Sequence, residues 1–146
     1  MTDNSGKTWM AIGETDDLDA VIKTFTADTA ITKGDPVYLS ADEQVTPAGA
    51  AQDCIGIAMI TVADTEPVSV LVRGRVKVAA GGAIARGKAV YGADSSHRVL
   101  MLTDVSQAVD EGGSAKYTVA VPANQKLGYA LQSTTTAGDL LFLEVR

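Results

Sequence analysis

Residues 82–89 come closest in this sequence to a motif that carries chemistry. Gly82 and the pair Gly87-Lys88 match the phosphate-binding loop G-x-x-x-x-G-K-[ST], except that Ala89 replaces the hydroxyl that would hold magnesium. Such a loop also needs a helix directly after it, so that backbone N–H groups face the phosphates. The residues that follow, 90–95, instead predict a strand and a turn. We therefore interpret Gly87 as a structural turn and expect no nucleotide or other cofactor.

The other residues that could do chemistry are isolated. His97 is the only histidine, and its neighbours on a turn cannot form a Ser-His-Asp arrangement, so we expect an exposed turn residue. Cys54 is the only cysteine and has no basic cluster to lower its pKa, which favours a small hydrophobic role. The acids at 16–19 lack the oxygen spacing of a calcium loop. We expect no metal site and no enzymatic activity.

Length, charge and hydropathy exclude several function classes. At 146 residues the chain has the length of one domain, and its formal net charge of −6 argues against nucleic-acid binding through phosphates. The longest nearly apolar stretch, Ile55–Ala63, is far shorter than a membrane-spanning helix of about 20 residues. The first residues lack the apolar core of a secretion signal. We expect a soluble protein made in a cytoplasm.

Residues 1–19 differ in composition from the rest of the chain. Lys7 is the only cation in this stretch against five acids, and Trp9, Met10 and Ile12 are grouped inside it. This composition predicts a flexible acidic N-terminal arm followed by a single domain over 20–146. Apolar side chains inside a polar arm need a surface that buries them, and this surface belongs either to the protein's own domain or to a partner.

From residue 20 onward the hydrophobic pattern alternates with a period of two, as in a pleated strand. Many short strands between Gly- and Pro-containing turns predict an all-β sandwich or small barrel. A helical turn is expected only at Thr103–Glu111. The expected strands are 21–26, 37–40, 44–46, 55–62, 68–73, 75–79, 89–92, 99–102, 116–121, 127–131 and 140–145.

The sequence also repeats itself. Residues 30–38 align with 83–91 at five identical positions, and later segments match in the same order, so that 30–73 corresponds to 83–146. Gly34 and Gly87 occupy the same place in the two copies and are expected to be turn residues with positive φ. Neither copy can bury its apolar face alone, so we expect the two to close on each other. The second copy is longer by residues 101–125.

The ordered motifs Ala-Ile-Thr-Lys-Gly-Asp-Pro-Val, Ile-Gly-Ile-Ala, Val-Leu-Val-Arg-Gly, Gly-Ala-Ile-Ala-Arg-Gly-Lys-Ala-Val-Tyr and Leu-Gly-Tyr-Ala-Leu resemble the capsid decoration (capsid cement) proteins of tailed phages. The likeness spans residues 25–146. It implies a compact β-barrel or β-tulip, a homotrimer, and a virion location on the outer capsid surface at three-fold or quasi-three-fold positions. The partner it implies is the major capsid protein of the expanded head.

Within that reading, Trp9, Met10 and Ile12 are the expected coat-binding anchor of the arm. The expected trimer interface is a face of small apolar residues. It consists of Val68, Val70, Val72, Val76 and Val78. The alternatives are another virion role, as a head-fibre or tail component, and a carbohydrate-binding β-module. The scarcity of aromatic residues argues against the carbohydrate-binding module, because sugar pockets usually need aromatic side chains.

Overall fold

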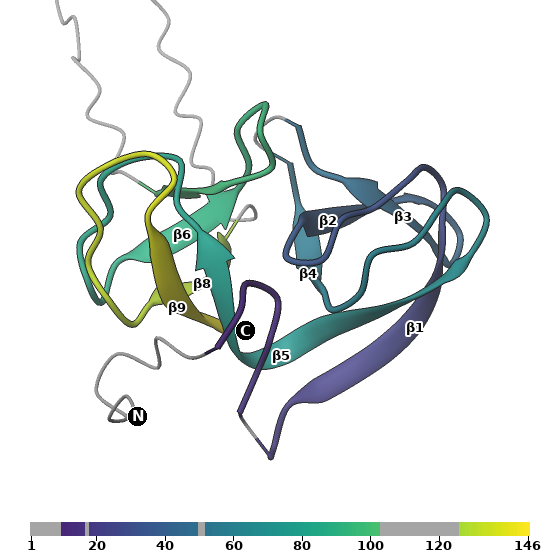
Figure 1. Ribbon diagram of the computed structural model, residues 1–146, viewed down its shortest axis with the longest axis horizontal. Coiled ribbons are helices and arrows are strands. Elements are labelled where there is room, and N and C mark those ends of the chain that lie inside the picture. Colours follow the sequence, from purple (N-terminus) through teal and green to yellow (C-terminus); the bar gives the residue numbers. More distant parts are fainter. Residues whose placement is uncertain (1–9, 17, 50–51, 103–125) are drawn as a thin grey trace, which may run out of the picture.

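The computed structural model describes residues 10–16, 18–49, 52–102 and 126–146 (Figure 1). These residues form strands and turns but no helix. The strands are β1 (Val21–Ala27), β2 (Pro36–Ala41), β3 (Gln44–Pro47), β4 (Cys54–Ala58), β5 (Pro67–Ala79), β6 (Ala89–Gly92), β7 (Val99–Met101), β8 (Lys126–Ala130) and β9 (Leu140–Val145).

The first five strands close into a small barrel, here called the first barrel. The order of hydrogen-bonded neighbours is β1-β3-β2-β4-β5, and β5 returns to pair with β1. Val68 and Val70, two positions apart on β5, both point into this barrel, as the period of two requires. The expected all-β fold with a small barrel is therefore confirmed. The buried side chains inside the barrel are Ala27, Ile31, Val37, Val45, Ala58, Val62, Val68 and Val70.

β5 continues into a second set of strands, here called the second barrel. Its last six residues pair with β9, and β8, β6 and β7 follow in that order. A parallel bridge between Ala80 and Val99 joins the end of β5 to β7. Figure 1 shows β5 running from one barrel to the other. The second core contains Ile57, Leu71, Val76, Val78, Ala80, Ile84, Val90, Val99, Leu127, Ala130, Leu141, Leu143 and Val145.

The repeat in the sequence is also a repeat in the structure. β2 pairs with β4 as β6 pairs with β8: Val37 lies opposite Gly56 as Val90 lies opposite Gly128, and a bulge follows Val37 and Val90 alike. Both glycines lie where an added Cβ would collide with a carbonyl oxygen of the neighbouring strand. Close approach of two backbones thus explains glycine at both positions.

The equivalence reaches further along the chain than the sequence alone indicated. The parallel pairing of Ala27 with Val45 in the first barrel corresponds to the Ala80–Val99 bridge in the second. The pairing of β1 with β5 likewise matches that of β5 with β9. The two copies therefore cover residues 21–73, the first repeat, and residues 74–146, the second repeat.

Gly34 and Gly87 have the same turn geometry. Their φ angles are +96° and +82°, a region that L side chains rarely adopt. The N–H of Gly34 donates to the carbonyl of Ala58 (2.8 Å), and the N–H of Gly87 donates to that of Ala130 (2.7 Å). Each turn is thereby fixed to the strand beside it, β4 or β8.

The strand boundaries differ from the expected ones by more than one residue at two places. Residues 68–73 and 75–79 belong to one strand, β5, which bends at Gly74 with a φ of +127° instead of ending there. β4 ends at Ala58, and Val62 forms only an isolated bridge with Ile31. The expected helical turn at 103–111 and strand at 116–121 lie outside the described residues.

Candidate interaction surface

The N-terminal segment, residues 10–16, lies against β5. The N–H of Gly13 donates to the carbonyl of Lys77 (2.7 Å), and the N–H of Lys77 donates to the carbonyl of Glu14 (3.2 Å). The buried Lys77 ammonium donates to the carbonyl of Met10 (2.9 Å). Met10 is only 4% exposed, and Ile12 packs over Gly34. Met10 and Ile12, expected as coat anchors, thus contact the protein's own domain, whereas Trp9 lies outside the described residues.

Two acids of this segment pair with the barrels. Lys33 Nζ donates to Glu14 Oε2 (3.0 Å), and Arg75 donates through Nε and Nη2 to Asp16 Oδ1 (3.1 and 2.9 Å). The hydrogen bond from Lys33 holds the pKa of Glu14 below its usual value. These pairs are partly exposed, so each contributes little to stability. They nevertheless fix the direction in which the segment crosses β5.

The five valines expected at a trimer interface lie within the barrels instead. Val68 and Val70 belong to the first core, and Val76 and Val78 to the second, each at most 1% exposed. Val72 is half-buried and packs against the first core. Side chains already enclosed in one chain present no area to another. Their burial reflects the position of β5, which contributes to both barrels.

The turn of residues 92–98, here called the second hairpin, is seated on the first barrel. His97 Nδ1 lies 2.7 Å from the carbonyl oxygen of Ala48, a distance at which the ring N–H donates. The N–H of Gln52 donates to the carbonyl of Gly92 (3.1 Å), and Gly92 packs against Pro36 and Cys54. The expectation of an exposed His97 is therefore wrong: the ring is half-buried because it joins the two barrels.

Asp94 stabilises the second hairpin through hydrogen bonds within the turn. Its Oδ1 accepts the backbone N–H groups of Ser96 and Arg98 (2.9 and 3.0 Å), and its Oδ2 accepts Arg98 Nε (2.9 Å). Burial raises the pKa of Asp94, but these hydrogen bonds outweigh it and lower the pKa overall. The ionised carboxylate thus holds the hairpin in the shape that places His97 against Ala48.

Cys54 lies in the contact between the barrels and is poorly placed for chemistry. Burial raises the pKa of its thiol to about 12, so the reactive thiolate is scarce near neutral pH. Its sulfur would lie 2.6 Å from a Cβ added at Gly92. This contact agrees with the expected role as a small hydrophobic side chain.

The glycine loop at 82–89 has the geometry of a turn. The N–H of Gly87 is taken by Ala130, and the N–H of Lys88 donates to the carbonyl of Ala85 (3.2 Å). β6 begins at Ala89, where a phosphate-binding loop would start a helix. Two of the backbone donors that would cradle phosphate are therefore already used within the fold.

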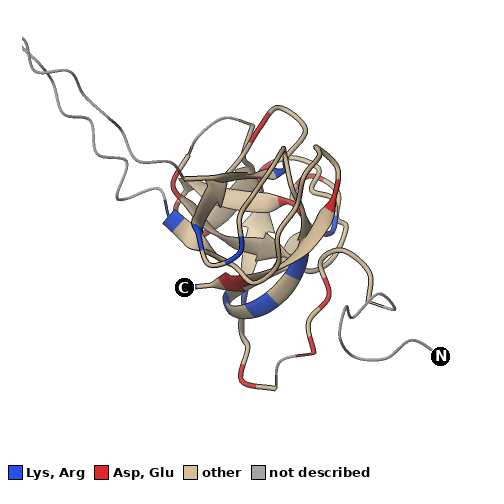
Figure 2. Ribbon diagram, turned by 90° about the vertical axis from the view of Figure 1, so that its left-hand side faces the viewer, with Lys and Arg blue, Asp and Glu red and all other residues tan. Residues whose placement is uncertain are grey.

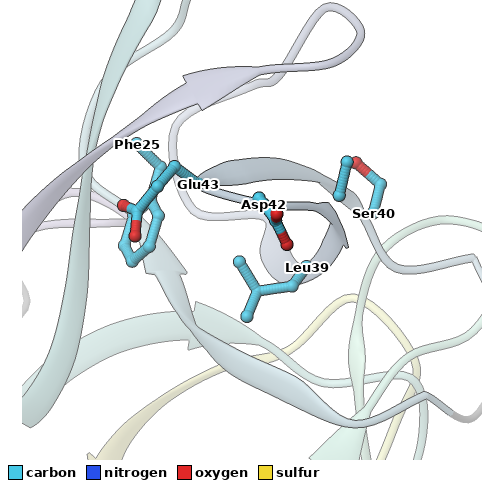
Figure 3. A pocket seen from close by; sticks show the side chains of 6 residues that line it. Phe25, Leu39, Ser40, Asp42 and Glu43 are labelled. Carbon is cyan, nitrogen blue, oxygen red and sulfur yellow. The ribbon is translucent and has the colours of Figure 1, made fainter.

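An open pocket of about 630 Å³ lies between β1 and the turn of residues 39–43, here called the first hairpin (Figure 3). It is lined by Phe25 and by the hairpin itself, whose Leu39, Asp42 and Glu43 are exposed. The lining combines an aromatic ring, an aliphatic side chain, the hydroxyl of Ser40 and two carboxylates, and no Lys, Arg or His is among the lining residues. Such a lining suits contact with another macromolecule better than catalysis. The sequence signal that could have found it is an exposed leucine beside two acids at a hairpin tip.

The part of the chain that the structure describes contains no cluster of three or more His, Cys, Asp or Glu side chains able to hold a metal ion. It also contains no helix with the length and hydropathy to cross a membrane.

Comparison with known proteins identifies the family. The family model described as phage cement protein matches residues 19–146, which include both barrels. No curated protein matches the sequence. Among solved structures, the crystal structure of the N base of head fiber gp8.5 of bacteriophage phi29 is similar, with a TM-score of 0.58 and 16% identity; the similarity covers 87% of this chain and 94% of that one. This likeness supports the fold. The chain belongs to the phage cement protein family and is a structural component of the phage head.

Proposed function

We propose that this protein binds the outer surface of the expanded capsid as a homotrimer and stabilises the coat lattice without catalysing a reaction. The observation that carries the proposal is the match of the cement-protein model to both barrels. The partner is the major capsid protein, at three-fold or quasi-three-fold positions.

The stabilisation follows from linked binding. A trimer that engages several coat subunits gains three attachments at once, which raises avidity by about 10² to 10⁴ over a single contact. Since the protein binds the assembled lattice and not free coat subunits, mass action shifts the equilibrium toward the intact shell. Each individual contact can therefore be weak.

The test is co-sedimentation of the full chain with expanded and unexpanded heads of the phage that encodes it. We expect saturable binding to expanded heads only, at a multiple of three chains per occupied position. Absence of binding to either form contradicts the proposal, and equal binding to both contradicts the role after expansion.

A second candidate is a head-fibre base, favoured by the structural likeness to the head fiber N base of phage phi29. A fibre base would carry a further protein outward from the head, whereas a cement protein acts alone. Electron micrographs of decorated heads distinguish the two, because a fibre base leaves projections beyond the thickness of this one domain.

A further inference from the structure

The two repeats carry opposite net charge. The first repeat has three cations and seven acids, a net charge of −4, whereas the second has eight cations and six acids, a net charge of +2. Figure 2 faces the second barrel and shows lysines and arginines on that side. Charge complementarity between two chains depends on exposed groups, and Asp42 and Glu43 in the first repeat are exposed, as is Lys88 in the second.

The hairpins of the two repeats also differ in what covers them. The second hairpin is buried on the first barrel through Gly92, His97 and the residues they contact. The first hairpin occupies the equivalent place in its repeat, yet Leu39, the counterpart of Gly92, is 49% exposed. Asp42 and Glu43 at its tip are exposed as well, beside the open pocket at Phe25 (Figure 3). Within the described structure, the second hairpin thus packs against a surface of the first barrel, whereas the described residues provide no such surface for the first hairpin.

Two of the residues that the second hairpin contacts, Pro36 and Cys54, have described equivalents on the second barrel. The strand registers make Ala89 the counterpart of Pro36 and Lys126 the counterpart of Cys54. The first hairpin carries Leu39 where the second carries Gly92, so a site for the first hairpin needs more room. Ala89 provides this room, because alanine is smaller than proline. Lys126, which donates to the hydroxyl of Tyr129 (2.8 Å), places a cation where the acidic hairpin would arrive. The exposed Lys88 adds a second cation next to Ala89.

We propose that the first hairpin of one chain docks on the second barrel of a second copy of this chain, with Leu39 against Ala89 and the tip acids facing Lys126 and Lys88. This contact between two chains has the same arrangement as the contact that the second hairpin makes with the first barrel within one chain. It is head-to-tail, because each chain contributes a different surface on each side, and such contacts close into rings or continue into filaments. The proposal rests on the self-association in the proposed function and assigns the surfaces that produce it.

Cysteine cross-linking tests the contact directly. In a Cys54→Ala background, chains carrying Leu39→Cys and chains carrying Ala89→Cys are co-expressed under different tags and mildly oxidised. We expect a disulfide-linked pair with one tag of each kind, and the same from Leu39→Cys with Lys126→Cys. The matched control pairs Leu39→Cys with Leu140→Cys, an exposed residue of the second repeat (47%) that lies opposite Ala79 and away from Ala89 and Lys126. Cross-linking no greater than in this control, for both pairs, overturns the proposal.

Charge reversal gives a second, independent readout. Asp42→Lys with Glu43→Lys is expected to raise the dissociation constant for self-association by about tenfold or more, because like charges then meet across the contact. The control, Asp64→Lys with Glu66→Lys, reverses two exposed acids elsewhere on the first repeat and is expected to change it less than about twofold. Sedimentation velocity over a concentration series provides the measurement. A wild-type protein that stays monomeric at every concentration, or a hairpin variant that associates as the wild type does, contradicts the proposal.

The two proposals can fail separately. Wild-type chains that bind expanded heads but show neither cross-links nor hairpin-dependent association would leave the cement function standing and remove this contact. Chains that associate through the hairpin but never bind heads would confirm the contact and contradict the cement function.

Discussion

Alanine substitution at the two equivalent turn glycines should have unequal costs. Both Gly34→Ala and Gly87→Ala place a side chain at positive φ, which costs about 1–2 kcal/mol. At Gly87 an added Cβ meets no atom within 4 Å, whereas at Gly34 it would lie 2.6 Å from Cγ1 of Ile12 and 3.0 Å from its Cδ1. Overpacking of this kind costs about 1–3 kcal/mol more. Gly34→Ala should therefore destabilise the protein by about 2–5 kcal/mol in total.

The additional destabilisation caused by Gly34→Ala, compared with Gly87→Ala, should depend on the N-terminal segment. In an Ile12→Ala background only the Cβ of residue 12 remains near the added methyl group, at 3.5 Å, which is an ordinary contact. Denaturant unfolding of both glycine variants, with and without Ile12→Ala, measures the coupling as a double-mutant cycle. We expect the two glycine variants to become nearly equal once Ile12 is removed. Equal costs in the wild-type background, or an excess that survives Ile12→Ala, would refute the packing of Ile12 on the Gly34 turn.

Three further predictions follow from the contacts between and around the barrels. His97→Ala should destabilise the protein by about 1 kcal/mol, since the Ala48 carbonyl loses its donor, and the melting temperature should fall by about 2–4 °C. Because the pKa of Asp94 is lowered, its carboxylate stabilises the fold above the unfolded pKa of about 3.9, and this contribution is lost as pH falls through the folded-state pKa. Asp94→Asn should thus melt below the wild type at pH 7 and match it near pH 2; an equal deficit at both values would contradict this. The Cys54 thiol, with a pKa of about 12, should react with an aromatic disulfide at pH 8 far more slowly in the native protein than in denaturant, and equal rates would argue against its burial.

The local features of the fold could be predicted from the sequence. The period of two located nearly every described strand, because the pleat alternates side chains between faces and most strands bury more of one face than of the other. The matching positions of Gly34 and Gly87 were also visible, because a tight turn at positive φ leaves glycine as the easiest solution.

The partners of apolar and charged residues could not be predicted in the same way. An apolar face on β5 is equally compatible with the protein's own core and with another chain, and only the topology places Val68 and Val76 in two different barrels. The ion pair of Asp16 with Arg75 joins residues 59 positions apart. The contact of His97 with Ala48 likewise spans 49 positions and depends on how the two barrels meet. No local pattern encodes such pairings.

Calorimetry of expanded heads, with and without saturating amounts of the full chain, tests the cement function most directly. Because the protein should bind the assembled lattice and not dissociated coat subunits, its addition should raise the temperature at which the heads disassemble, by an amount that grows with its concentration. An unchanged transition temperature at full occupancy would contradict the account, since the protein would then attach to the head without stabilising it.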